Sequence, residues 1–211
     1  MSDENSMPYE KAIEETAKAV SNSVDLVREG GRAIGPAIGN IYGLLIGDKV
    51  SAARVRRLDE ITRKTEQILR DRDVKERQEL PEDIAIPLLE AAQGESREEL
   101  QDVWARLLAN AMDPERAHDV LPEFITTVSR LQPIDVLMLQ IVSTASASKP
   151  VSEENAAERL KQSTDDRIEY RPAAARLSLA RLEELKCTRR LPGSYYAMTD
   201  YGHELIVAVQ P

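Results

Sequence analysis

Apolar residues recur three or four positions apart through most of this chain, which is the spacing of amphipathic helices. The clearest stripe follows Ser-Arg-Glu-Glu at 96–99, the spacing of a capping box in which the serine caps the helix and the second glutamate reaches back. Trp104 falls on the apolar face of this helix, and Asp113-Pro114 ends it. Other helices are predicted over 9–28, 48–73, 87–92, 122–131, 133–142, 152–161, 172–185 and 199–209. The pattern predicts a mainly α protein.

Prolines set several of these boundaries. Leu80-Pro81 and Ile86-Pro87 are expected in a connection, because a proline biases the residue before it toward extended geometry. Proline is tolerated in the first turn of a helix, so the short helix over 87–92 is predicted to begin at its proline and to be capped by Gly94.

Strand character occurs in one region near the C-terminal end. Residues 187–198, with Pro192-Gly193 between the runs CTRRL and YYAM, predict a β-hairpin. Three predicted helices precede the hairpin, and Thr199 can cap a closing helix after it, an order that is typical of a winged helix-turn-helix module. The sequence therefore predicts a helical domain over 1–132 and a small winged-helix-like module with one β-hairpin over 133–211.

Glycine takes every fourth position in one uncharged stretch. No charged residue occurs over 33–47, whereas 31% of the whole chain is charged. The glycines are spaced as neighbours on one helix face, and we name them the glycine ladder: Gly31, Gly35, Gly39, Gly43 and Gly47. Each glycine inside a helix costs roughly 0.5–1 kcal/mol relative to alanine, and close approach of another helix is the usual compensation. The ladder predicts a tightly packed helix, and Pro36 should kink this helix or start a new one.

The glycine ladder has two other interpretations besides close helix packing: membrane contact and a phosphate-binding loop. As a helix, the uncharged stretch would span about 22 Å, short of the roughly 30 Å hydrocarbon core of a bilayer. A single span is therefore disfavoured, but membrane contact through 33–47 after a conformational change is an alternative. A phosphate-binding glycine loop is disfavoured, because no strand precedes the ladder and no Gly-Lys-Ser or Gly-Lys-Thr follows it.

Composition narrows the class of protein. Aromatic residues make up only 4% of the chain, so the core must be aliphatic. The net charge of -9 argues against coating nucleic acid or an anionic membrane by charge alone. The single cysteine, Cys187, excludes an intrachain disulfide and fits a reducing compartment, and the acidic N-terminus has no apolar signal region. A cytoplasmic protein is predicted, with membrane association in an active state as the alternative.

No set of residues points to catalysis. Neither His118 nor His203 lies in a metal-binding spacing, and both are expected at the surface or satisfied locally. Cys187 lies between a predicted helix and a predicted strand, where a small apolar core residue is usual. The carboxylates alternate with Arg and Lys in the pattern of surface ion pairs. We expect a protein with no enzymatic activity, no metal site and no cofactor.

A basic patch raises the question of nucleic-acid binding. Residues 171–190 hold six cations and two anions, a net of +4, in the part of a winged module that contacts DNA. The residues that would serve a DNA-binding regulator are Arg171, Arg176, Arg189 and Arg190. Residues 133–211 as a whole carry a net charge of -1, however, which does little to attract DNA.

The outer face of the helix predicted over 172–185 favours protein contact instead. Leucines at 179, 182 and 185 set the inner face, and the opposite face carries Ala173, Leu177, Ala180 and Glu184, with Arg176 at its edge. A helix that reads bases should present Arg, Asn, Gln, Ser or Thr there. We therefore expect Ala173, Leu177 and Ala180 to contact protein, either the N-terminal helices or a second copy, with nucleic acid as the less favoured partner.

Several segments taken together resemble the bacterial abortive infection alpha family. They are PAIGNIYGLLIGD, IPLLEAAQ, REELQDVWARLLANAMDP, PEFITTVSRLQPIDVLMLQ and YAMTDYGHEL. The resemblance spans most of the chain from the glycine ladder onward and implies a role in bacterial defence against phage, without implying any catalytic residue. Our leading hypothesis is a non-enzymatic defence protein whose ladder helix rearranges on infection. A DNA-binding regulator and a membrane-active effector are the alternatives.

Overall fold

The computed structural model describes residues 51–145, 150–163 and 171–210. The glycine ladder, the stretch 33–47 and the helix predicted over 9–28 lie outside these residues. The described elements are α3 (Ser51–Asp71), α4 (Glu82–Gly94), α5 (Glu98–Met112), η1 (Ala117–Asp119), α6 (Pro122–Arg130), α7 (Pro133–Ser143), β1 (Val151–Ser152), α8 (Ala156–Ser163), α9 (Pro172–Glu184), β2 (Thr188–Leu191), β3 (Tyr195–Met198) and α10 (Asp200–Ala208). The prediction of a mainly α protein is confirmed.

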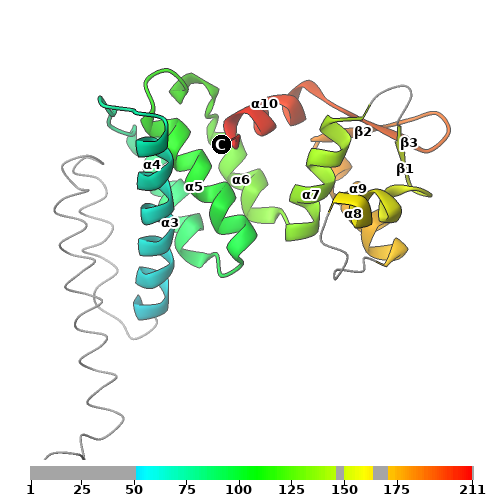
Figure 1. The fold of residues 1–211 in the computed structure, drawn as a ribbon, viewed down its shortest axis with the longest axis horizontal. Coiled ribbons are helices and arrows are strands. Elements are labelled where there is room, and N and C mark those ends of the chain that lie inside the picture. The colour runs from blue at the N-terminus through cyan, green and yellow to red at the C-terminus, as the bar shows by residue number, and fades with distance from the viewer. Residues whose placement is uncertain (1–50, 146–149, 164–170, 211) are drawn as a thin grey trace, which may run out of the picture.

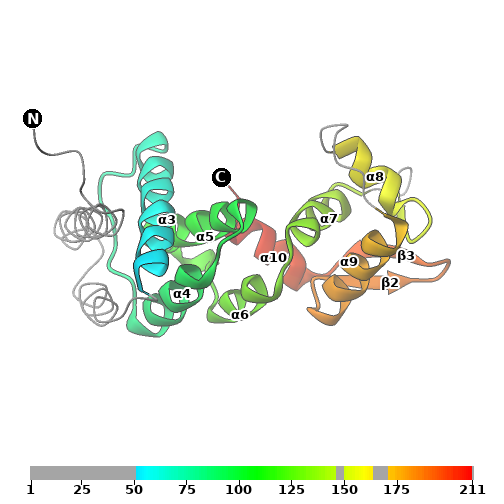
Figure 2. The same ribbon diagram turned by 90° about the horizontal axis from the view of Figure 1, so that it is seen from below.

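The described elements from α3 to α6 form what we call the helical half. Helix α5 is at its centre, packed between α3 and α4 on one side and α10 on the other (Figures 1 and 2). Trp104 of α5 is 1% exposed, which confirms its place in the core. Leu58 and Ile61 of α3 are also fully buried, and the hydroxyl of Thr65 donates a hydrogen bond to the carbonyl oxygen of Ala105 at 3.2 Å. The predicted aliphatic stripes therefore meet in one core.

Helix α4 begins earlier than the sequence indicated. The prediction of a connection that ends at Pro87 is wrong, because α4 runs from Glu82 to Gly94 with the proline inside it. A proline at this position removes the hydrogen bond to the carbonyl of Asp83. Both Asp83 and Pro87 are exposed, so water can satisfy that carbonyl, while Leu88 and Leu89 are buried on the opposite face. Burial of the apolar face outweighs one lost hydrogen bond.

The start of α5 is set by a glutamate and not by the predicted serine cap. The capping-box prediction at 96–99 is wrong, since Arg97 is the N-cap residue and no side chain caps the helix. The carboxylate of Glu95 accepts hydrogen bonds from the backbone N–H of Arg97 at 2.9 Å and from its guanidinium at 2.7 Å. Hydrogen bonds between charged groups are stronger than the neutral one that Ser96 could offer, so they decide the local conformation.

The C-terminal elements follow the predicted order of three helices, a hairpin and a closing helix, with one addition. Strands β2 and β3 form the predicted hairpin, with Arg190 opposite Tyr196 in the register. The addition is β1, which pairs antiparallel with β3 and gives a sheet of order β1-β3-β2. The helix expected from residue 152 begins instead at Ala156, because Ser152 belongs to β1. In the turn between β1 and α8, Ser152 and Asn155 exchange hydrogen bonds between their side chains and backbone N–H groups.

Helix α10 returns from the sheet to the helical half, where it lies between the two ends of the molecule (Figure 2). Its first turn is capped as predicted, since Thr199 accepts a hydrogen bond from the N–H of Gly202 at 3.0 Å. The side-chain amide of Asn110 donates to the carbonyl of Ala208 at 2.7 Å, and the hydroxyls of Thr127 and Tyr201 are 2.6 Å apart. These bonds join α10 to α5 and α6. The division at residue 132 stays a prediction.

Cys187 is fully buried, as predicted, and its thiol should be chemically inert in the folded protein. Burial, together with the nearby charge of Asp135, raises the pKa of the Cys187 thiol to about 12. Because the thiolate is the reactive form, we expect no reaction with a disulfide reagent such as DTNB at pH 8 until the protein unfolds in urea, when one thiol should react. A thiol that reacts in native buffer as fast as free cysteine would contradict this burial.

Candidate protein-contact surface

Within the described ranges, no group of three or more His, Cys, Asp and Glu side chains is placed to hold a metal ion. His118 is 76% exposed in η1, and His203 is exposed on α10. No helix in the described part of the chain is both long enough and apolar enough to cross a bilayer.

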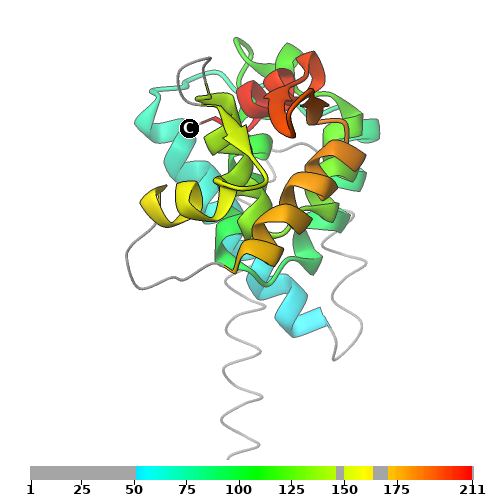
Figure 3. The same ribbon diagram turned by 90° about the vertical axis from the view of Figure 1, so that its right-hand side faces the viewer.

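The outer face of α9 carries the most exposed large apolar side chain of the described structure. Leu177 is 64% exposed, whereas Leu179 and Leu182 on the inner face are fully buried. The neighbours of Leu177 on this face are also exposed, and together they form what we name the α9 surface: Ala173, Arg176, Leu177, Ala180 and Glu184. Figure 3 shows α9 crossing the outer end of the molecule with no other described element in front of it. The predicted division of this helix into two faces is confirmed.

Helix α9 is held in place by an ion pair whose carboxylate is buried. The guanidinium of Arg181 lies 2.7 Å from Oδ2 of Asp135, a carboxylate that is fully buried at the start of α7. The same oxygen accepts a hydrogen bond from the N–H of Gln132 at 2.7 Å, so it caps α7 and binds α9 at once. A second ion pair joins Arg130 at the end of α6 to Glu184 at the end of α9. The α9 surface is thus presented by a fixed helix.

A chain of polar contacts continues from this ion pair into the helical half. Gln132 accepts a hydrogen bond from Arg97 at 2.7 Å, and Arg97 in turn contacts Glu95. Burial opposes ionisation of Glu95, but the hydrogen bonds from Arg97 outweigh it and lower the pKa of this carboxyl below its usual value. The carboxylate likewise raises the pKa of Arg97. The order of contacts is Glu95, Arg97, Gln132, Asp135 and Arg181.

The four arginines of the DNA-binding alternative come from two elements. Arg171 and Arg176 are exposed at the N-terminal end of α9, and Arg189 and Arg190 are exposed on β2. Arg190 is neutralised by Glu153, whose carboxylate lies 2.8 Å from the guanidinium. The exposed side of α9 also includes Glu183 and Glu184. The acidic side chains of Glu183 and Glu184 on α9, and of Glu153 between β1 and α8, therefore interrupt the basic patch.

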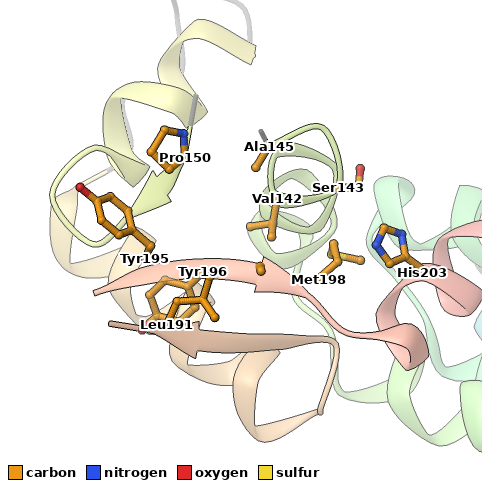
Figure 4. A pocket seen from close by; sticks show the side chains of 10 residues that line it. Val142, Ser143, Ala145, Pro150, Leu191, Tyr195, Tyr196, Met198 and His203 are labelled. Carbon is orange, nitrogen blue, oxygen red and sulfur yellow. The ribbon is translucent and has the colours of Figure 1, made fainter. Parts of the chain in front are cut away.

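Sequence reasoning missed a groove of about 560 Å³ between α7, β3 and α10. Its lining is mostly apolar and includes Val142 of α7 and Tyr196 and Met198 of β3, with Pro150 and His203 toward its two ends (Figure 4). Helix α7 is far from β3 and α10 in the sequence, so no spacing signal could have indicated the groove. A second, polar hollow of about 440 Å³ lies around Arg72 and Arg116. Its lining includes acidic as well as basic side chains, such as that of Asp113.

Comparison with known proteins gives one match. A family model described as abortive infection alpha matches residues 53–196. No curated protein matches the chain, and no solved structure matches it. The matched range contains the α9 surface and the polar contacts behind it, whereas the glycine ladder and α10 fall outside it.

Proposed function

This chain belongs to the abortive infection alpha family, and from that premise we propose that it is a non-enzymatic phage-defence protein that works through protein–protein contacts at the α9 surface. The observation that carries the proposal is the 64% exposure of Leu177 on a helix whose opposite face is buried in the core. The family supplies the role in defence against phage, and the surface supplies the means of contact. No catalytic group, metal or cofactor is part of this proposal.

The α9 surface has the properties of a preformed contact site. Full burial of a leucine side chain is worth about 1.5–3 kcal/mol, and an exposed leucine can gain much of this when a partner covers it. Ala173 and Ala180 beside it allow the partner to approach the helix closely. Because Arg181 and Asp135 fix the helix before binding, little ordering cost is added when the contact forms.

Protein is a better partner for this surface than DNA. Direct reading of bases uses side chains that donate and accept hydrogen bonds, such as Arg, Asn and Gln. At the centre of the exposed α9 face lie Leu177 and Ala180, and Glu184 follows them. A carboxylate there would face phosphate groups and oppose binding. DNA binding through Arg171, Arg176, Arg189 and Arg190 is therefore the less favoured alternative, and the plating experiment distinguishes it from protein contact.

The parts of the proposal that concern the glycine ladder rest on the sequence. We propose that the ladder helix rearranges on infection and that 33–47 is the segment that would contact a membrane. A cytoplasmic location, with membrane association in the active state, belongs to the same proposal. These residues lie outside the described structure, so the first experiment addresses α9.

Substitution of Leu177 by glutamate should abolish protection. Bacteria that express the parent chain should reduce plaque formation by a sensitive phage, and bacteria with L177E should plate phage as well as cells without the protein, because a charge would occupy the centre of the contact. The matched control is Ile86→Glu, which changes a residue of 37% exposure on α4. Efficiency of plating measures both, and immunoblots should show equal protein levels.

Two results would count against the proposal. Protection by L177E equal to that of the parent would show that the α9 surface is not the contact. Loss of protection in R171E and R189E, with L177E unaffected, would favour the DNA-binding regulator, which should then retard DNA in gels at low salt and release it as salt rises. I86E should protect in either case.

A further inference from the structure

We infer that the partner of the α9 surface is the α9 surface of a second copy of this chain, crossed antiparallel about a two-fold axis at Ala180. This inference rests on the proposed function, because it names the partner of the same surface. Most soluble oligomers are symmetric, and a two-fold interface must be complementary to itself. The charges and sizes of the side chains on α9 meet that requirement in one register.

The charges of the α9 surface are placed symmetrically about Ala180. Arg176 lies four residues before Ala180, and Glu184 lies four residues after it. In an antiparallel crossing centred on Ala180, Arg176 therefore lies opposite Glu184 of the partner subunit, and the two-fold axis repeats this pair. Ala180 meets its own copy at the axis, where a small side chain permits close approach. Leu177 falls between Ala180 of the partner subunit and Glu184 of the partner subunit.

Other registers of the same crossing are less favourable. An axis between Ser178 and Leu179 would place Arg176 opposite Arg181 of the partner subunit, and like charges at an interface are costly. An axis at Leu177 would place Arg176 opposite a buried serine and leave Glu184 beyond the start of the partner helix. The axis at Ala180 is therefore the register that satisfies both charges.

Arg176 and Glu184 are both exposed and can form this contact between two copies. None of the described residues forms an ion pair with Arg176, which is exposed. Glu184 already pairs with Arg130, but the side chains of that pair are 66% and 51% exposed, respectively. A carboxylate has two oxygens with about four acceptor positions, so Glu184 can accept hydrogen bonds from Arg130 and from Arg176 of the partner subunit together.

The expected dimer is weak and reversible. Stable protein–protein interfaces usually bury about 1,200–2,000 Å² in total, and one pair of crossed helices with five surface residues each falls below this range. We therefore expect association that depends on protein concentration, with a dissociation constant in the micromolar range or weaker. Sedimentation velocity of the full chain over a concentration series is the direct measurement.

Disulfide cross-linking tests the position of the axis. Ala180→Cys should form a disulfide-linked dimer on mild oxidation, because its two copies face each other at the axis. Ala173→Cys is the matched control, since it is also an exposed alanine on α9, but its copies would lie about 21 Å apart at a rise of 1.5 Å per residue. The native Cys187 is fully buried and should not compete. Equal cross-linking of A180C and A173C would overturn the inference.

Charge reversal tests the register independently. R176E and E184R should each weaken dimer formation about tenfold or more, because each places like charges opposite each other. The double variant R176E/E184R should bind more tightly than either single variant, since the pair across the axis is restored with its signs exchanged, although the contact of Glu184 with Arg130 is lost. A chain that is monomeric at every concentration, or a double variant no tighter than the single ones, would overturn the inference.

The two proposals can fail separately. A monomeric chain in which L177E still abolishes protection would mean that α9 contacts a different protein, so the second copy is wrong and the proposed function stands. A dimeric chain in which L177E protects as well as the parent would refute the proposed function, even if the crossing at Ala180 is correct.

Discussion

Replacement of Gly202 by alanine is expected to lower the free energy of unfolding by about 3 kcal/mol or more, the upper end of the range for overpacked sites. A Cβ atom at this position of α10 would lie 2.0 Å from the carbonyl oxygen of Cys187 and 2.9 Å from Cε of Met198. The methionine can move, but the carbonyl cannot move freely. It accepts hydrogen bonds from the N–H and the hydroxyl of Thr199, so a shift would break the start of α10.

Gly94→Ala is the matched control, because nothing lies within 4 Å of a Cβ at the end of α4. There alanine should be neutral or should stabilise by up to about 1 kcal/mol, since it reduces the entropy of the unfolded chain. Urea unfolding followed by the fluorescence of the single, buried Trp104 measures both variants. If G202A unfolds at the same urea concentration as G94A, α10 does not pack against Cys187 as described.

Loss of the ion pair between Arg181 and the buried Asp135 should be almost as costly. We expect Arg181→Met to lower the free energy of unfolding by about 3 kcal/mol, because it keeps most of the side-chain bulk and leaves a buried carboxylate without its paired cation. Asp135 is fully buried, and its Oδ1 has no hydrogen-bond partner among the described residues, so Oδ2 carries its contacts with Arg181 and Gln132. Urea unfolding at pH 7 is again the measurement.

Arg130→Met provides the comparison for Arg181→Met. It removes an ion pair to the same helix, but one that is exposed, and should cost about 1 kcal/mol or less. The double variant D135N/R181M should lose less than the sum of its single losses, because the neutral amide no longer needs a cation. A loss in R181M no larger than that in R130M would show that water, and not Arg181, satisfies Asp135.

The helices with long apolar stripes were predictable from sequence, and the exceptions have local causes. The stripe of α5 and the proline starts of α6 and α7 gave correct positions, because periodicity and proline geometry act within a few residues. Pro87 was misleading, since the apolar face of α4 outweighs one lost hydrogen bond. Ser96 was misleading because a charged neighbour, Glu95, binds the backbone more strongly.

Contacts between distant parts of the chain were beyond sequence reasoning. Strand β1 has two residues, which is too short for an alternating pattern, and its partner β3 lies more than forty positions away. Nothing near Asp135 indicates that Arg181, also more than forty positions away, supplies its cation. The α9 surface could be anticipated, however, because a helical wheel separates Leu177 from the buried Leu179 and Leu182 without knowledge of the neighbours.

The return of α10 to α5 has a consequence for synthesis on the ribosome. The amide of Asn110 is satisfied by Ala208, so α5 lacks part of its final surroundings until α10 has emerged. Roughly 100 residues separate the ends of these two helices, and at about 5–20 residues per second their translation takes about 5–20 s. During that interval the nascent chain exposes the side of α5 that α10 later covers. Chaperone binding in that window would therefore influence how much protein matures.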